Sequence, residues 1–316
     1  MIGSIRFIRP VLNIILCSSL LGCASSGFYA PPGSELTQLP PAPLGIAEAG
    51  DRTFFANGRR ERVTAVNDGL IDIRRSSTYQ YLRYQDFTLN EKTVKSSNGV
   101  TDAEIVDLNP KASLWPLQAG KRVKFGVVKT RGEEPRGDAA NPGIFWECSV
   151  DGMQTVTVIT GEFDTYRIEC VRKNSRNKIK QYVTRFYAPA IQQVVLRIDR
   201  YPYKPTKRVE LVAFQPALTL LSRASARRYK QHFQNTLETV ASGTTTSWWS
   251  RRSDTRIQTT PTNTRKLGSD LYCRNYLVKV NSKGSPRSGA GLVCRDDKGQ
   301  WRVPRKIDTD KGELTF

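Results

Sequence analysis

Short runs of β-branched and aromatic residues follow one another from residue 51 to about residue 216. They lie at residues 69–73, 79–84, 123–127, 156–158, 166–168, 180–187, 194–198 and 209–212. Runs of this composition, separated by Gly, Pro, Asn and Asp, are typical of antiparallel strands. A series of strands without helices between them predicts that the first domain, residues 51–216, is an antiparallel sheet or a half-open barrel.

A different spacing marks residues 218–241, where apolar positions recur every three or four residues. This period predicts an amphipathic helix, with Gly243 as a candidate C-terminal cap. The positions on this face are Leu218, Leu221, Ser225, Tyr229, Phe233, Leu237 and Val240. Arg223, Arg227 and Lys230 lie on the opposite face, and a basic stripe there is either solvated or in contact with an anionic surface.

Strand patterns return between residues 244 and 304. Residues 272–280 and 289–295 flank a polar turn that contains Gly284 and Pro286, which predicts a hairpin. We therefore expect a second domain at residues 217–304, in which one helix packs on a small antiparallel sheet, and then a polar tail at residues 305–316. The fold class predicted for the whole chain is β-rich α+β.

Four cysteines lie in the two predicted domains: Cys148, Cys170, Cys273 and Cys294. An even number of cysteines indicates disulfides in an oxidising compartment, and four allow three pairings. We favour Cys148–Cys170 and Cys273–Cys294, because each pair brackets a hairpin-like stretch and cross-strand neighbours have Cβ atoms about 4.5–5.5 Å apart. A zinc site is the alternative, but neither pair has the Cys-x-x-Cys spacing, so we predict two disulfides and no metal.

The N-terminus has the features of an export signal. Arg6 and Arg9 precede a mostly apolar run at residues 11–21, which ends in small residues. The run is about half as long as the roughly twenty residues that a membrane-spanning helix needs. We therefore predict that residues 1–22 are a signal peptide.

The end of this signal, Leu20-Leu21-Gly22-Cys23, resembles the lipobox of bacterial lipoproteins. In that family the cysteine receives a diacylglyceryl group and becomes the mature N-terminus, so the resemblance implies lipidation at Cys23. The alternative is an ordinary signal with a chance cysteine. No Asp follows Cys23, and in lipoproteins this implies the outer membrane. The Pro- and Gly-rich residues 23–50 predict a flexible tether.

The net charge narrows the class of partner. The chain has 49 Lys and Arg against 29 Asp and Glu, a formal charge of +20, which favours an anionic partner. Export removes most nucleic acid from reach, so we expect no nucleic-acid partner. Peptidoglycan, lipopolysaccharide, anionic phospholipid or another envelope protein are the candidates, and the alternative is that the charge only keeps the protein soluble.

Several short motifs follow one another in the C-terminal quarter of the chain. They are Leu237-Glu238, Ser242-Gly243, Trp249, Tyr272-Cys273-Arg274-Asn275-Tyr276, Gly289-Ala290-Gly291 and the run from Cys294 to Trp301. Their order and spacing resemble the 17-kilodalton surface antigen family of outer-membrane proteins. The resemblance implies an envelope lipoprotein and no particular reaction. The glycine-zipper segment of some members is absent here.

Motifs for catalysis are scarce. The single histidine, His232, lacks a nearby nucleophile or further metal ligands, which a Ser-His-Asp triad or a catalytic zinc site needs. No P-loop or dinucleotide-binding motif occurs. Glu133-Glu134 and Asp296-Asp297 are the adjacent carboxylates that a glycan-cleaving site could use, but both lie in turn-like stretches. We predict that the protein is not an enzyme and needs no cofactor.

Aromatic residues beside arginines form two candidate contact surfaces. Trp248-Trp249 and Arg251-Arg252, together with the basic helix face, are the candidates for contact with an anionic surface. The alternative is that one Trp packs in the core and the other is exposed. Tyr79, Tyr81 and Arg83 share a strand face and are candidates to line a groove, although a half-buried sheet surface explains them equally well.

These observations predict a lipid-anchored, non-enzymatic envelope protein that binds an anionic envelope polymer or a partner protein. Two alternatives remain, and each has a structural signature. An enzyme acting on peptidoglycan or another glycan would need a groove that pairs two carboxylates. A lipid carrier would need a deep apolar cavity in the first domain.

Overall fold

The structure is a computed structural model that describes residues 39–86, 91–96, 99–107, 113–131, 134–136, 142–267, 271–308 and 313–316. The described residues from Leu39 to Phe316 belong to one compact unit. The predicted signal peptide and Cys23 lie outside the described residues.

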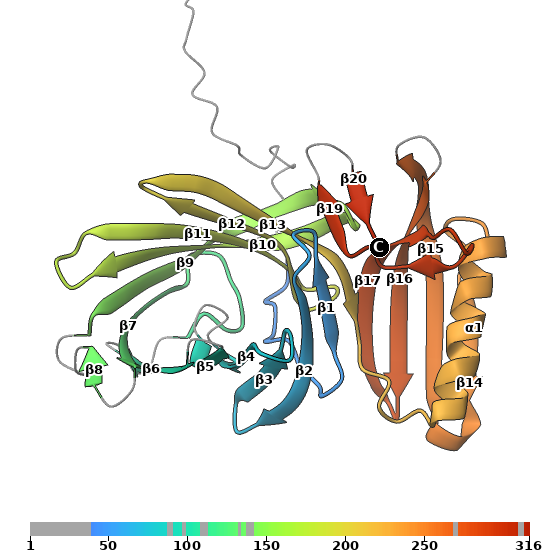
Figure 1. The fold of residues 1–316 in the computed structure, drawn as a ribbon, viewed down its shortest axis with the longest axis horizontal. Helices are drawn as coiled ribbons and strands as arrows, with labels where there is room; N and C mark the ends of the chain where they lie inside the picture. Colours follow the sequence, from blue (N-terminus) through green and yellow to red (C-terminus); the bar gives the residue numbers. More distant parts are fainter. Residues whose placement is uncertain are drawn as a thin grey trace, which may run out of the picture. The chain divides into compact units, whose positions relative to one another are not determined.

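Twelve antiparallel strands of the described residues pair in a closed ring, which forms a barrel (Figure 1). Arg52 lies opposite Arg62 on one side of the first strand and opposite Gln215 of the last strand on the other, and this pairing closes the ring. The strands are β1 (Arg52–Phe55), β2 (Arg60–Asn67), β3 (Leu70–Arg74), β4 (Gln80–Tyr84), β5 (Glu91–Ser96), β6 (Gly99–Asp107), β7 (Arg122–Arg131), β9 (Ile144–Val158), β10 (Gly161–Asn174), β11 (Ile179–Ala188), β12 (Gln193–Tyr201) and β13 (Lys204–Gln215). The short β8 (Glu134–Arg136) pairs with β7 outside the ring.

The prediction of an α+β fold with an open sheet or half-barrel is therefore wrong. Closure leaves no edge strand in the ring, whereas an open sheet would expose two rows of unpaired backbone N–H and C=O groups. The predicted runs match β3, β4, β7 and β9–β13, but β1, β2, β5 and β6 were not among them. No local pattern shows that β1 pairs with β13.

A second sheet continues from the barrel. β13 pairs with β17 as well as with β1, because Ala213 lies opposite Gly291 and Phe214 opposite Ala290. A side chain at Gly289 would place its Cβ 2.5 Å from the Phe214 carbonyl oxygen, so the small residues of β17 permit this close approach. The sheet consists of β14 (Thr246–Ser250), β15 (Thr255–Leu267), β16 (Leu271–Ser282), β17 (Ser285–Arg295) and β18 (Trp301–Arg302), and a short 3₁₀ turn, η1 (Arg251–Ser253), joins its first two strands.

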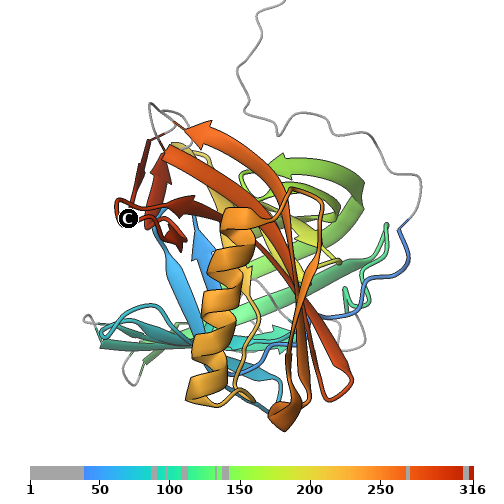
Figure 2. The same ribbon diagram turned by 90° about the vertical axis from the view of Figure 1, so that its right-hand side faces the viewer.

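The single helix of the described residues, α1 (Arg223–Thr239), covers one face of this second sheet (Figure 2). It begins later than residue 218 because Ser222 caps it, with the Ser222 side chain accepting a hydrogen bond from the Ser225 N–H. Its C-terminal cap is Val240, not Gly243. The Arg274 guanidinium also donates hydrogen bonds to the carbonyls of Leu237 and Val240, which satisfies acceptors at the helix end.

The helix face predicted from the apolar period packs on the sheet. Leu237 is fully buried and joins Ile257, Tyr276 and Val293 in a common core. Trp301 belongs to the same core and holds the helix directly, because its indole N–H donates to Glu238 at 2.9 Å. The C-terminal residues pair as β19 (Lys306–Asp308) and β20 (Glu313–Thr315).

Both predicted disulfides are present in the structure. Cys148 lies opposite Cys170 in the β9–β10 pair, and Cys273 lies opposite Cys294 in the β16–β17 pair. The prediction succeeds because each hairpin carries both partners and the turn that aligns them. Separately, none of the helices in the described residues is both long and apolar enough to span a membrane.

Candidate functional site

The interior of the barrel has an apolar part and a charged part. The apolar part contains Phe125, Trp146 and the Cys148–Cys170 disulfide, and residues from before β1 help to fill it. Leu39 and Pro40 enter there, since the Tyr166 hydroxyl donates to both of their carbonyls at 2.9 Å. Among the described residues, this part of the barrel is therefore packed with protein side chains.

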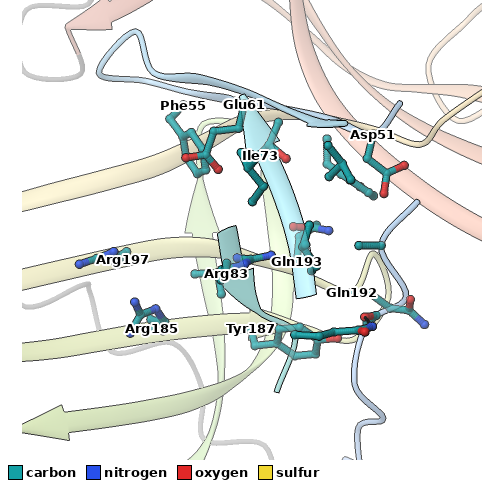
Figure 3. A pocket seen from close by; sticks show the side chains of 18 of the residues that line it. Asp51, Phe55, Glu61, Ile73, Arg83, Arg185, Tyr187, Gln192, Gln193 and Arg197 are labelled. Atoms are coloured by element: carbon teal, nitrogen blue, oxygen red, sulfur yellow. Dashed lines mark hydrogen bonds between the residues drawn. The ribbon is translucent and has the colours of Figure 1, made fainter. Parts of the chain in front are cut away.

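The charged part contains a cavity of about 150 Å³ between β1–β4 and β11–β13. Figure 3 shows Arg83, Arg185 and Arg197 lining it from three different strands. Alternation along the strands places these side chains inside, because residues two apart share a face. The arginines that line the cavity are Arg59, Arg75, Arg83, Arg185 and Arg197.

Two of these arginines face each other across the β11–β12 ladder. Arg185 lies directly opposite Arg197, and Arg185 is only 3% exposed. Like charges directly opposite each other destabilise a sheet. Burial lowers the pKa of the Arg185 guanidinium well below its usual value, and the positive charge of Arg197 lowers it further, although Asp199 opposes the shift. A negative charge in the cavity would relieve this repulsion.

One carboxylate, Glu61, is shared among the arginines on the opposite wall. Its Oε1 lies 3.2 Å from Arg59 Nε and 3.0 Å from Arg75 Nε. Burial raises the pKa of Glu61, but the arginines outweigh burial, and the pKa lies below its ordinary value of 4.5. Burial and the nearby Glu61 charge raise the pKa of the Tyr81 hydroxyl, so Tyr81 stays neutral and is able to donate a hydrogen bond.

The remaining carboxylates near the cavity are already matched. Asp199 accepts a hydrogen bond from Arg197 at 2.9 Å. Asp51 lies at one end of the cavity, where Arg287 of β17 binds both of its oxygens at 2.7 Å. Among the described residues, the five guanidiniums that line the cavity have Glu61 on one wall and Asp199 bound to Arg197 beside it, so positive charge is in excess around the cavity.

This arrangement is suited to binding a small anionic group. Arginine presents a planar set of donors that matches carboxylate and phosphate oxygens. Arg83 Nε is buried and has no hydrogen-bond partner among the described residues. A volume of about 150 Å³ holds roughly five waters at about 30 Å³ each, which suits a single phosphate or carboxylate group rather than a whole polymer.

Comparisons with known proteins show sequence similarity over a small part of the chain. No family model matches the chain. It is 33% identical over 70 residues to the 17 kDa surface antigens of Rickettsia conorii and Rickettsia rickettsii, and 31% identical over 70 residues to that of Rickettsia bellii. The match covers 22% of this chain and 44% of each relative, so the chain spans less than half the length of the curated relatives it matches.

Among solved structures, the hypothetical lipoprotein YmcC from Escherichia coli is similar at 12% identity and a TM-score of 0.36, over 53% of this chain and 84% of that chain. The sequence relatives bear the same family name as the resemblance drawn from the C-terminal motifs. The match covers 22% of the chain, and the motifs lie within about a quarter of it.

The groove predicted from Tyr79, Tyr81 and Arg83 corresponds in part to this cavity. Tyr81 and Arg83 line it, and Tyr81 is 4% exposed. Tyr79 contacts Tyr81 edge to face at a ring-centroid distance of 6.3 Å. The sequence therefore offered residues of one wall as groove candidates, with a half-buried sheet surface as the alternative, whereas Arg185 and Arg197 on the other wall were not predicted.

The residues predicted to contact an anionic surface lie on the second sheet and its helix. Arg223, Arg227 and Lys230 are exposed on α1, as are Arg251 and Arg252 of η1. Their contact with an anionic surface stays a prediction.

The two tryptophans of that set have different surroundings. Trp248 packs on Tyr229 of the helix, with ring centroids 5.6 Å apart. Trp249 is 51% exposed beneath the Arg251 guanidinium.

The remaining candidates for catalysis are the adjacent carboxylates and the single histidine. Asp296 accepts hydrogen bonds from the backbone N–H groups of Lys298 and Gln300, so it shapes a turn. His232 is half-buried on α1, and Glu133 lies outside the described residues. Within the described part of the chain, no three His, Cys, Asp or Glu side chains are grouped to hold a metal ion.

Proposed function

We propose that this protein is a lipid-anchored envelope protein, not an enzyme, and that it binds an anionic group of an envelope molecule inside its barrel. The observation that carries the proposal is the arginine-lined cavity, in which Arg185 lies opposite Arg197. Relatives named as surface antigens support an envelope role. The cavity matches the phosphate of a lipopolysaccharide or the carboxylate of peptidoglycan in chemistry and in size.

Anion binding is tested with inorganic phosphate and the variant Arg83→Gln. Arg83 is half-buried and lacks a described hydrogen-bond partner on Nε, so we expect the variant to fold. Phosphate at about 100 times its Kd should stabilise the wild type by about 2.7 kcal/mol. Arg83→Gln should weaken phosphate binding by roughly tenfold, the equivalent of about 1.4 kcal/mol. Isothermal titration calorimetry and thermal unfolding measure both effects.

Arg256→Gln is the matched control, because Arg256 is exposed on β15 of the second sheet and the substitution removes the same charge. We expect this control to bind phosphate as the wild type does. Equal weakening in both variants would mean that phosphate senses only the net charge of the protein. Unchanged binding in Arg83→Gln would overturn the assignment of the cavity.

The lipid anchor is tested by the intact mass of the protein extracted from membranes of its host. We expect a chain that begins at Cys23 and carries acyl groups, because Leu20-Leu21-Gly22-Cys23 resembles a lipobox. Cys23→Ser should release the protein from the membrane fraction, whereas Cys17→Ser, six residues earlier in the predicted signal, should leave the anchored mass unchanged. A mature wild-type protein without acyl mass would refute the anchor.

A further inference from the structure

A second cavity, of about 450 Å³, lies beneath α1 where the second sheet meets β1 and β2. Its walls are mainly apolar, and this volume is within the range of about 300–1,000 Å³ typical of small-molecule sites. The apolar lining includes Leu218, Ala226, Tyr229, Phe233, Tyr276 and Val278. Leu218, Tyr229 and Phe233 are only partly buried, so apolar surface stays open to a ligand.

The edge of this cavity carries positive charge alone. Arg52, Arg62 and Lys230 line it, and no carboxylate is among the described lining residues. Strand alternation explains the separation from the barrel interior: Thr53 and Glu61 point inward to the first cavity, whereas Arg52 and Arg62 point outward. The two cavities share no lining residue among those described.

The two arginines at this edge belong to a ladder of like charges that continues to Arg74. Arg52 lies directly opposite Arg62, and Arg62 lies directly opposite Arg74. Such pairs destabilise a sheet. None of the three forms an ion pair with a carboxylate of the described residues. The arrangement therefore places an unneutralised pair of guanidiniums beside an apolar cavity.

We infer that this cavity binds a long-chain fatty acid anion, with its acyl chain between α1 and the sheet and its carboxylate on Arg52 and Arg62. Burial of an acyl chain contributes about 0.8 kcal/mol per methylene. Guanidiniums bind a carboxylate through paired N–H donors. An apolar wall with a purely cationic edge is complementary to a ligand that has one apolar chain and one negative end.

The test uses the fluorescent fatty acid cis-parinaric acid and the folded full-length protein. Parinarate fluorescence should rise on binding, and oleate should displace it. Ala226→Trp should fill the cavity and weaken binding by roughly tenfold or more. Ala224→Trp is the matched control, because Ala224 is exposed on the same helix, and its affinity should equal that of the wild type.

The role of the two arginines in binding the carboxylate is tested by a double variant, Arg52→Gln combined with Arg62→Gln. Both positions are exposed, so the fold should persist even where Ala226→Trp fails to fold. The double variant should weaken oleate roughly tenfold and leave its neutral analogue, methyl oleate, unchanged. Equal oleate affinity in the wild type and the double variant would overturn the inference, and so would parinarate binding that Ala226→Trp leaves intact. Ala226→Trp should leave phosphate binding in the barrel unchanged, and that binding is tested by Arg83→Gln. The two proposed sites are therefore tested independently.

Discussion

Replacement of Glu61 by Gln is expected to lower the free energy of unfolding by about 3–5 kcal/mol, because breaking a buried ion pair leaves uncompensated charge. The Glu61 side chain is 11% exposed and contacts both Arg59 and Arg75. Urea unfolding measures the change. Glu162→Gln is the control, because Glu162 is exposed on β10 and its replacement should change stability little. A similar loss in both variants would contradict the role assigned to Glu61.

The same residue should make stability depend on pH. The pKa of Glu61 lies below 4.5 in the folded protein, so the folded state binds its proton less readily than the unfolded state does. The stabilising contribution is complete above pH 4.5 and is lost as the pH falls through the folded pKa. The wild type should therefore lose stability relative to Glu61→Gln on acidification below that value. Parallel stability curves for the two proteins would refute the shift.

Removal of the Cys273–Cys294 bridge by a double substitution to serine is expected to cost about 3 kcal/mol, because the bridge restricts the unfolded chain. The two cysteines are 21 residues apart and fully buried. Denaturant unfolding of the variant and of the wild type gives the difference.

The Cys148–Cys170 bridge is the matched comparison, because its partners are 22 residues apart and the same chain-entropy argument gives almost the same loss. A reductant breaks both bridges, so it should lower the stability of the wild type by about the sum of the two single losses, below that of either variant. A wild type that is no more stable than the variants without reductant would show that the bridges do not form.

Features that depend on residues close in the sequence could be predicted, and features that join distant segments could not. The Cys273–Cys294 bridge follows from one hairpin, and the face of α1 follows from a local period. Closure of the barrel depends on Arg52 facing Gln215, which no local pattern signals. The pairing is visible only once every strand between them is placed.

The arginine pair in the barrel, Arg185 and Arg197, could not be predicted for a different reason. β11 is buried on both faces, since Val183 on one face is 1% exposed and Phe186 on the other is 3% exposed. A strand of this kind lacks the alternation that separates an inner from an outer face. Tyr81 and Arg83 could be placed on one face because they lie two residues apart in β4, although the sequence did not show that this face is the inner one.

Closure of the barrel between its first and last strands also sets a condition on how the molecule can form. On one side β1 pairs with β2. Its other partner is β13, which is synthesised last of the strands in the ring. Bringing such distant segments together carries a loop-closure entropy that grows with the length between them. Until then, β1 and β12 each present a free row of backbone donors and acceptors, which is a template for pairing with another chain. A nascent chain that lacks β13 is therefore at its most aggregation-prone just before completion, and the same strand that ends this exposure also begins the attachment of the second sheet.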